Sequence, residues 1–146
     1  MNNCLYIPNS TDVYYNILSE ENILKGVLIV DDDESVRRTL KDYLSLYGIP
    51  VLGVGRDGYE AIDLFEKLQP DVVLLDITMP NLDGFGALEM IQRKNENAKV
   101  IMLTAHAESD YKFAAKILKS CVYITKPYEM QDVVDTIHKM LAISAA

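Results

Sequence analysis

The segment Val72-Val-Leu-Leu-Asp-Ile-Thr-Met-Pro80 indicates the fold most clearly. Its opening run of four apolar residues is too short for a buried helix, and it ends at once in a carboxylate, Asp76. Such a run is typical of a fully buried strand in a parallel sheet, where ligands bind beyond the carboxyl ends of the strands. The segment therefore predicts an α/β protein with a functional site near Asp76.

Short apolar runs of the same kind recur from residue 27 onward, and longer segments of helical period lie between them. We predict five strands, at residues 27–30, 51–54, 72–75, 100–103 and 122–124. We predict five helices, near residues 35–46, 59–68, 85–93, 109–118 and 130–141. This alternation predicts a parallel sheet with helices on both faces.

The length of 146 residues and the hydrophobic fraction of 49% suit one domain with one sizeable core. We expect this domain to span residues 26–142 and to be followed by a short tail at residues 143–146. Residues 1–25 form an N-terminal extension whose pattern favours a short amphipathic helix. The prediction leaves no room for an output domain within this sequence.

Charge and composition argue against several classes of protein. The 14 basic and 22 acidic residues give a net charge of −8, whereas nucleic-acid-binding surfaces need clustered Lys and Arg. The two cysteines, Cys4 and Cys121, show neither metal-ligand spacing nor a disulfide framework, which fits a reducing compartment. No apolar run reaches the roughly 20 residues of a membrane-spanning helix, and a signal peptide is not evident. We expect a cytoplasmic protein without direct nucleic-acid or membrane binding.

Several predicted strands end in side chains with functional chemistry. These side chains are Asp31, Asp32 and Asp33 after the first strand, Asp76 after the third, Thr104 after the fourth and Lys126 after the fifth. Right-handed crossover connections bring the carboxyl ends of parallel strands to one edge of the sheet. One pocket can therefore hold several carboxylates, a hydroxyl and an ammonium group.

Carboxylates placed this close together repel each other, so such a cluster usually binds a cation. Mg²⁺ is the expected ion, because it accepts one or two carboxylates and leaves positions open for water and a phosphate oxygen. Asp76 is then a candidate nucleophile for phosphoryl transfer, with charge neutralised by Mg²⁺ and Lys126. Thr104 offers a hydroxyl donor to the same phosphoryl oxygens.

The chain resembles the receiver family of two-component response regulators over about residues 27–141. The resemblance rests on Val27-Leu-Ile-Val-Asp-Asp-Asp33, on the segment from Val72 to Pro80 with Asp83-Gly84, on Leu103-Thr-Ala105 and on Tyr123-Ile-Thr-Lys-Pro127. It implies a flavodoxin-like, doubly wound three-layer sandwich whose five parallel strands are arranged in the order 2-1-3-4-5. It also implies a stand-alone signalling switch rather than an enzyme.

The resemblance assigns roles to individual residues. Asp76 is the expected phosphoacceptor and ligates Mg²⁺ together with Asp32 and the backbone carbonyl of Thr78, while Asp31 contributes through a water molecule. Thr104 and Tyr123 are expected to shift after phosphorylation and change a protein-binding face, and the Lys126-Pro127 peptide is expected to be cis. The expected partners are a sensor histidine kinase or histidine phosphotransfer protein and a downstream target that the sequence does not name.

Other positions receive secondary predictions. Thr78 and His106 flank the site and are expected to tune how fast water reaches the phosphoaspartate, whereas Asp33 is expected to be a solvated neighbour. His138 is expected to be solvated or favoured by the dipole near the end of the last helix. Where the family usually closes its fourth helix with glycine, this chain has Lys119-Ser-Cys-Val122, so the end of that helix is expected to differ.

Alternative interpretations remain at this point. Gly53-Val-Gly-Arg-Asp-Gly58 has the spacing of a dinucleotide-binding loop, but it follows the second strand and leaves the acidic cluster unexplained. An aspartate-dependent phosphatase would need a second Asp as general acid where this chain has Thr78. A docking module without phosphorylation and a fragment of a longer regulator are the other two alternatives.

Overall fold

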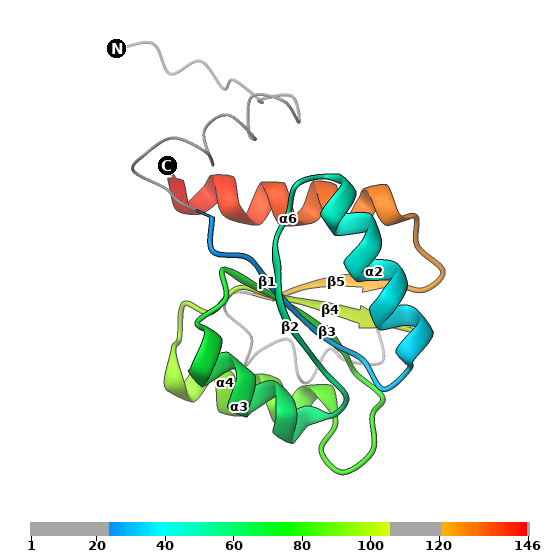
Figure 1. Cartoon of the computed structure of the whole chain (residues 1–146). Helices are drawn as coiled ribbons and strands as arrows, with labels where there is room; N and C mark the ends of the chain where they lie inside the picture. Colours follow the sequence, from blue (N-terminus) through cyan, green and yellow to red (C-terminus); the bar gives the residue numbers. More distant parts are fainter. Residues whose placement is uncertain (1–23, 106–120, 146) are drawn as a thin grey trace.

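The computed structural model describes residues 24–105 and 121–145. Within these ranges, a five-stranded sheet lies between α2 and α6 on one face and α3 and α4 on the other (Figure 1). The elements are β1 (Val27–Val30), α2 (Glu34–Leu46), β2 (Val51–Gly55), α3 (Gly58–Leu68), β3 (Val72–Asp76), α4 (Gly84–Lys94), β4 (Val100–Thr104), β5 (Cys121–Thr125) and α6 (Met130–Ala145). The predicted three-layer α/β architecture is confirmed.

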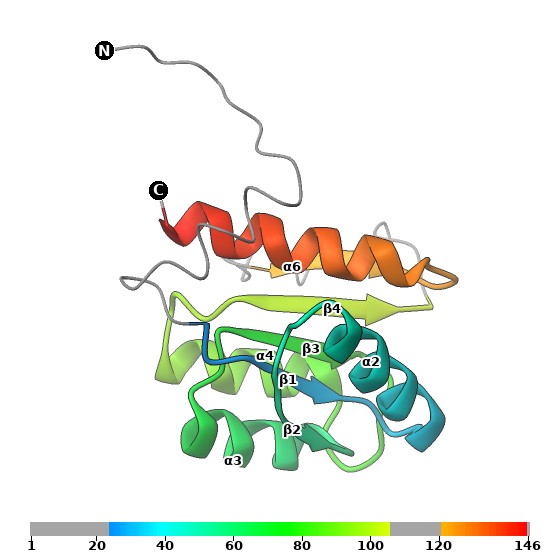
Figure 2. The same ribbon diagram turned by 45° about the horizontal axis from the view of Figure 1, so that its top comes forward.

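All strand pairs are parallel, and the strand order is β2-β1-β3-β4-β5, as expected. The chain moves outward from β1 to β2 and then returns to the other side of β1 with β3. This reversal of direction makes the carboxyl ends of β1 and β3 a topological switch point, the usual position of a ligand site in an open α/β sheet. Figure 2 shows the two helical layers on opposite sides of the sheet.

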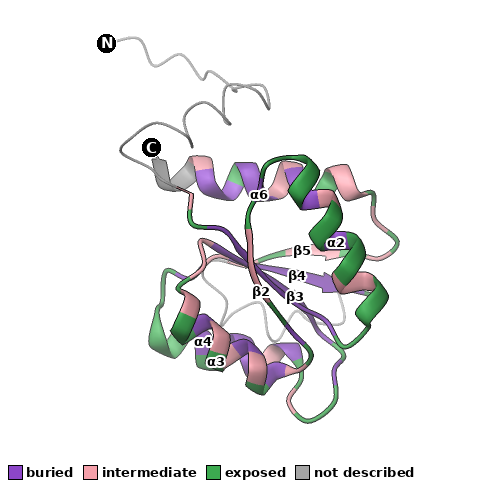
Figure 3. Ribbon diagram, in the orientation of Figure 1, coloured by how far each residue is buried: buried purple, intermediate pink, exposed green. Residues whose placement is uncertain are grey.

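Alternation along the strands divides the apolar core between the two faces. On β1, Val27 and Ile29 pack with α2 and α6, whereas Leu28 and Val30 pack with α3 and α4. The central strands are buried on both faces (Figure 3), which explains why their sequences are continuous apolar runs. Truncating one such side chain, as in Leu74→Ala, is expected to cost about 2–5 kcal/mol.

Aspartates cap three of the helices that follow a strand. Asp33, Asp57 and Asp83 each have extended backbone, and their side chains accept hydrogen bonds from amides of the first turn of α2, α3 and α4. After α2, Gly48 has a φ of 70°, the left-handed conformation that favours glycine. The three aspartate caps determine where the loops at the carboxyl edge of the sheet end and their helices begin.

The strands and helices are slightly longer than predicted. The structure extends β2, β3 and β4 to include Gly55, Asp76 and Thr104, because the ladder hydrogen bonds continue past the last apolar residue. The predicted extension at 1–25 and helix at 109–118 fall almost wholly or wholly outside the described residues. No helix in the described part of the chain is long and apolar enough to cross a membrane.

One position on α6 corrects the sequence prediction. His138 was expected to be solvated or favoured by the dipole near the helix end, but only 6% of it is exposed, and α6 continues to Ala145. It lies four residues after Val134 and three before Leu141, both of which belong to the core, so it shares the buried face of α6. Burial lowers the pKa of its imidazole, against the opposing effect of Asp135.

Candidate functional site

The strand register brings the predicted site residues to one edge of the sheet. Val30 on β1 pairs with Leu75 on β3, so the next residues along, Asp31 and Asp76, are neighbours across the switch point. On the other side of β3, Asp76 pairs with Leu103, and Thr104 is the next and last residue of β4. This register is a direct consequence of the parallel pairing of the buried runs.

Three carboxylates gather at this edge. One oxygen from each of Asp31, Asp32 and Asp76 lies within 4.8 Å of the others. Asp31 and Asp76 are only 2% and 7% exposed, whereas Asp32 is open to solvent. The cluster therefore has a buried inner part and an accessible outer part, an arrangement suited to an ion that keeps some of its water.

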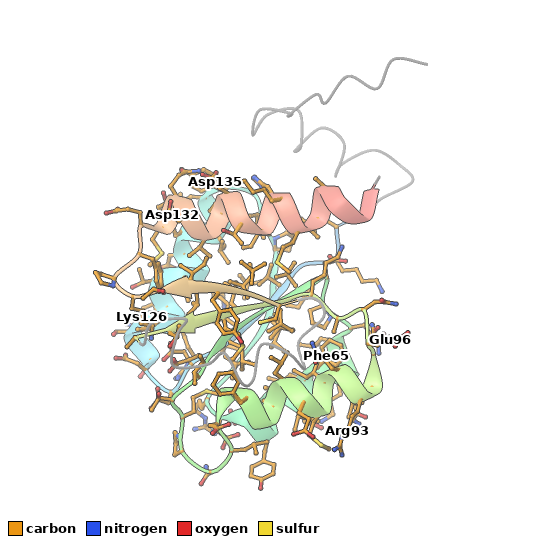
Figure 4. All side chains as sticks on the ribbon, turned by 180° about the vertical axis from the view of Figure 1, so that it is seen from behind. Phe65, Arg93, Glu96, Lys126, Asp132 and Asp135 are labelled. Carbon is orange, nitrogen blue, oxygen red and sulfur yellow. The ribbon has the colours of Figure 1, made fainter. Side chains whose placement is uncertain are left out.

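Lys126 supplies the positive charge of the site from the loop after β5 (Figure 4). Its backbone N–H donates to the carbonyl of Thr104 at 2.6 Å, which continues the β4–β5 ladder past the last strand residue. Its Nζ lies 3.5 Å from Oδ1 of Asp76 and 3.7 Å from Oδ2 of Asp31. These distances indicate ion pairs to two carboxylates rather than a short hydrogen bond to either. The Lys126-Pro127 peptide is cis, as predicted.

The electrostatics of the cluster favour protonation of the buried carboxylates. Burial, helped by the charge of Asp31, raises the pKa of Asp76 to about 6 against the opposing effect of Lys126. Burial also raises the pKa of Asp31, although a backbone N–H and Lys126 act in the other direction. One ammonium group does not compensate these closely spaced negative charges, so a divalent cation would relieve the repulsion.

Backbone contacts hold Asp31 in place. Its Oδ1 accepts the N–H of Asp33 at 2.9 Å, and its carbonyl accepts a hydrogen bond from the Arg37 guanidinium at 2.7 Å. Its Oδ2 has no hydrogen-bond donor among the described residues, apart from the longer ion pair with Lys126. An acceptor that is buried, fixed and short of donors is suited to binding a cation or a water molecule bound to one.

Asp33 has a role that the sequence prediction missed. It is exposed, as expected, but it is more than a solvated neighbour of the acidic cluster. Its Oδ1 accepts from the backbone N–H and the hydroxyl of Ser35 at 2.8 and 2.7 Å, and it caps α2. These donors lower the pKa of the Asp33 carboxyl, so it does not share the unfavourable environment of Asp31 and Asp76.

The remaining predicted residues occupy different environments. Thr104 is 1% exposed at the end of β4, Tyr123 is half-buried on β5 against the core beneath it, and Thr78 is exposed in the loop after β3. His106 lies outside the described residues, as does the helix end at Lys119. The structure therefore brings Thr104, Asp76 and Lys126 to one edge, and the roles assigned to Thr78, His106 and Tyr123 stay predictions.

Two residues near the site were not identified from the sequence. Arg37 lies on the first turns of α2, and its guanidinium reaches back to the carbonyl of Asp31. Tyr128 is half-buried beside the cluster, and its pKa is raised to about 12 by burial and by the charges of Asp31 and Asp76. Sequence spacing gives no signal for either contact, because both depend on how a loop and a helix pack across the edge.

Packing accounts for the glycines that mimic a dinucleotide-binding loop. A Cβ at Gly53 would lie 2.7 Å from a methyl of Leu68, and one at Gly58 would lie 2.5 Å from the carbonyl oxygen of Leu82. Asp57, between them in sequence, caps α3. The glycines therefore allow β2, α3 and the loop after β3 to approach one another closely.

Comparisons with known proteins agree with this geometry. The family model described as the response regulator receiver domain matches residues 27–138. The chemotaxis protein CheY of Thermotoga maritima is 35% identical over 80% of this chain and 97% of its own length. A probable transcriptional regulator, ycf27 of Guillardia theta, is 40% identical over 79% of this chain but only 44% of its own length.

A solved structure shows the same fold. A chain in the crystal structure of the CheX–CheY–BeF3–Mg²⁺ complex from Borrelia burgdorferi superposes with a TM-score of 0.72 and 30% identity, covering 81% of this chain and 88% of that one. The chain thus spans nearly all of some relatives and about half of others.

Proposed function

This chain belongs to the response regulator receiver domain family of two-component systems, and we propose that Asp76 is its phosphoacceptor. Receiver domains are signalling switches that interact with histidine kinases and downstream effectors. The observation that carries the proposal is the position of Asp76, which is buried at the switch point between two other carboxylates and Lys126. A docking module that is not phosphorylated would not need these buried carboxylates, whose burial costs free energy.

The proposed reaction moves a phosphoryl group from a histidine to an aspartate. A carboxylate oxygen of Asp76 attacks the phosphorus of a phosphohistidine, a new O–P bond forms and the P–N bond breaks. The released imidazole takes a proton from solvent and leaves as neutral histidine. To end the signal, water attacks the phosphorus, inorganic phosphate leaves and the Asp76 carboxylate returns.

The donor set fits Mg²⁺ as the cofactor. Three carboxylates within 4.8 Å, one of them exposed, offer the hard oxygen ligands that this ion prefers, and the similar structure from Borrelia burgdorferi is a complex with Mg²⁺. We propose that Asp32 and Asp76 bind the ion directly, with the backbone carbonyl of Thr78, and that Asp31 binds through water. When bound, the ion would neutralise charge on the phosphoryl oxygens.

The neighbouring side chains have positioning and signalling roles in this proposal. Lys126 pairs with Asp76 before phosphorylation and would pair with a phosphoryl oxygen afterwards, and the hydroxyl of Thr104 would donate to another. The backbone N–H of Lys126 donates to the carbonyl of Thr104, so a shift of either residue would displace β5, on which Tyr123 lies. Tyr123 is the proposed reporter of the switch to a protein partner.

The proposed donors and targets are proteins. A sensor histidine kinase or a histidine phosphotransfer protein would supply the phosphoryl group, and a downstream protein would read the altered face. Relatives such as the ycf27 regulator are longer than this chain, so transcriptional control through an additional domain is a second proposal, favoured by its 40% identity. Thr78 and His106 are proposed to tune the lifetime of the phosphorylated state.

Intact-mass analysis tests the phosphoacceptor directly. We expect incubation with Mg²⁺ and acetyl phosphate to add one phosphoryl group that is labile at alkaline pH. The adduct should be absent from the Asp76→Asn variant and from a sample with EDTA, and it should form in Asp71→Asn, which changes a carboxylate at the opposite edge of the sheet. Adduct formation on Asp76→Asn would reject the assignment. A wild-type protein that takes no phosphoryl group from acetyl phosphate or from a phosphorylated phosphotransfer protein would favour the docking module.

A further inference from the structure

The loop that follows Asp76 is attached to a neighbouring loop on the same edge. Residues 77–83 connect β3 to α4, and they begin directly after the proposed phosphoacceptor. Ile77 and Met79 are 5% and 8% exposed and anchor this loop in the core, while Thr78 between them is open to solvent. The far half of the loop, from Pro80 onward, contacts the short connection between β2 and α3.

Two hydrogen bonds make this connection. The side-chain amide of Asn81 donates to Oδ2 of Asp57 at 2.9 Å, and the backbone N–H of Gly58 donates to the carbonyl of Leu82 at 2.9 Å. Close packing reinforces them, because a Cβ at Gly58 or at Gly86 would lie 2.5 Å from an atom of Leu82. The far half of the loop is therefore held from the β2–α3 side.

Asp57 is shared between two functions. Its Oδ1 accepts the N–H of Glu60 and caps α3, and its Oδ2 receives Asn81. Both contacts lower the pKa of its carboxyl, with the Glu60 contact as the larger cause. Asp57 thus stays ionised at neutral pH, so it is a charged and strong acceptor for the Asn81 amide.

Asn81 has a backbone conformation that needs an explanation. Its φ is 67°, a left-handed value that most L residues avoid and that asparagine tolerates better than most. Leu82 follows it and donates its N–H to the carbonyl of Pro80 at 2.8 Å, so the chain turns tightly here. The side-chain bond to Asp57 fixes this turn in one arrangement.

We infer that Asp57 and Asn81 are positioning residues that hold the loop of residues 77–83 in the geometry required by the site at Asp76. This inference rests on the proposed function, in which the carbonyl of Thr78 is a ligand of Mg²⁺. A loop that is ordered before the ion arrives loses less conformational freedom on binding, so the hydrogen bond raises affinity without touching the ion. Loss of one such bond is expected to weaken Mg²⁺ binding about threefold to tenfold.

A double-mutant cycle tests the inference, with the Mg²⁺ dissociation constant measured by isothermal titration calorimetry. Asp57→Asn keeps the cap of α3 through its oxygen but replaces the charged acceptor by a neutral amide, which pairs more weakly with the Asn81 amide. Asn81→Asp sets two carboxylates against each other. The double variant restores one donor and one acceptor with the same net charge. We expect each single change to weaken binding, and the double variant to recover most of the loss instead of adding the two losses together.

Additional variants separate positioning from general destabilisation. Asn81→Gly keeps the left-handed turn accessible but removes the bond, and it should weaken Mg²⁺ binding and speed amide hydrogen exchange in residues 77–83. Arg56→Ala removes an exposed ion pair with Glu60 in the same β2–α3 connection and should leave both measurements unchanged. Additive effects in the cycle, or equal exchange rates in Asn81→Gly and wild type, would overturn the inference.

The experiment also distinguishes this inference from the proposed function. If wild type binds Mg²⁺, Asp32→Asn does not, and the cycle shows no coupling, the metal site stands and the positioning role fails. If wild type and Asp32→Asn bind Mg²⁺ alike, the proposed metal site itself fails, and the positioning role fails with it.

Discussion

Aspartates at the two edges of the sheet lie in opposite environments. At the amino edge, Asp71 precedes β3; its Oδ2 accepts the N–H of Gly26 at 2.8 Å and its own N–H donates to the Gly26 carbonyl at 2.9 Å. At the carboxyl edge, Asp76 ends the same strand, and its closest cationic partner, Lys126, is 3.5 Å away while other carboxylates lie within 4.8 Å. Asp71 therefore stabilises the fold through hydrogen bonds to the backbone, whereas Asp76 is held in an environment that is unfavourable for its charge.

The difference shows where this protein departs from the rules that stabilise a fold. A carboxylate that receives backbone donors satisfies both itself and the donors, and it contributes to stability. Buried carboxylates that face each other are short of compensation and reduce the stability of the ion-free protein. Departures of this kind are expected at functional sites, where a ligand completes the arrangement.

Removing the charge of Asp76 should change stability more than any other substitution at these edges. Its pKa of about 6 lies above the ordinary value of 3.8, so the folded protein holds this proton more strongly than the unfolded chain does. The stabilisation from that proton is complete below about pH 4 and is lost as the pH rises through 6, which amounts to about 3 kcal/mol at most. We expect Asp76→Asn to raise the free energy of unfolding by up to that amount at about pH 8 in EDTA.

Urea unfolding at about pH 8 and about pH 4 checks this prediction. The gain from Asp76→Asn should shrink toward zero at the lower pH, where wild type carries the proton itself. Equal stabilities of the two proteins at the higher pH would mean that the environment of Asp76 is not unfavourable, and the contrast with Asp71 would then be lost.

Much of this contrast could be predicted from the sequence. All five predicted strands agree with the structure within one residue at each end, because each is apolar, short and bounded by polar residues. The positions of Asp31, Asp76 and Thr104 after such runs were enough to predict a common edge, since parallel strands place their carboxyl ends together.

The parts that could not be predicted depend on side-chain packing. The contact of Arg37 with the Asp31 carbonyl and the closeness of Tyr128 to the cluster depend on side chains that reach across the edge. The prediction for His138 is wrong because its place near a helix end suggested solvent, while the neighbouring apolar residues of α6 carry that turn into the core. The helical period places His138 on the buried stripe, because Val134 lies four residues before it and Leu141 three residues after it.

Adding Mg²⁺ should relieve the repulsion at one edge only. An ion that binds the folded protein stabilises it by about 2.7 kcal/mol when its concentration is about 100 times the dissociation constant. We expect a gain of this size for wild type in thermal or urea unfolding, and little gain for Asp32→Asn. Asp71→Ala should respond to Mg²⁺ as strongly as wild type does, and a missing response in that variant would show that the two edges are not independent.

Removing the carboxylate at the amino edge should have the opposite sign from Asp76→Asn. Asp71→Ala leaves the N–H of Gly26 without its side-chain acceptor at a partly buried position. We expect a loss of about 1–2 kcal/mol in the free energy of unfolding, at about pH 8 and without metal. Asp71→Asn, which keeps an acceptor oxygen, is the matched control and should lose less. A stabilising Asp71→Ala would contradict the comparison.

The smallest effect on stability is expected from substitution of Asp33. This residue tests whether Asp71 and Asp76 differ because of the edge at which they lie or because of the hydrogen-bond donors that reach their carboxylates. Asp33 lies at the carboxyl edge beside the acidic cluster, yet its carboxylate accepts from Ser35 at 2.8 Å and its pKa is lowered by these bonds. If donors decide, Asp33→Ala should destabilise the protein by about 1 kcal/mol, the usual cost of a lost helix cap, although it removes a negative charge from the cluster. Asp33→Asn keeps an acceptor oxygen and should be close to wild type in urea unfolding. If instead the edge decides, Asp33→Ala should stabilise the protein as Asp76→Asn does, because relief of repulsion would outweigh the lost cap.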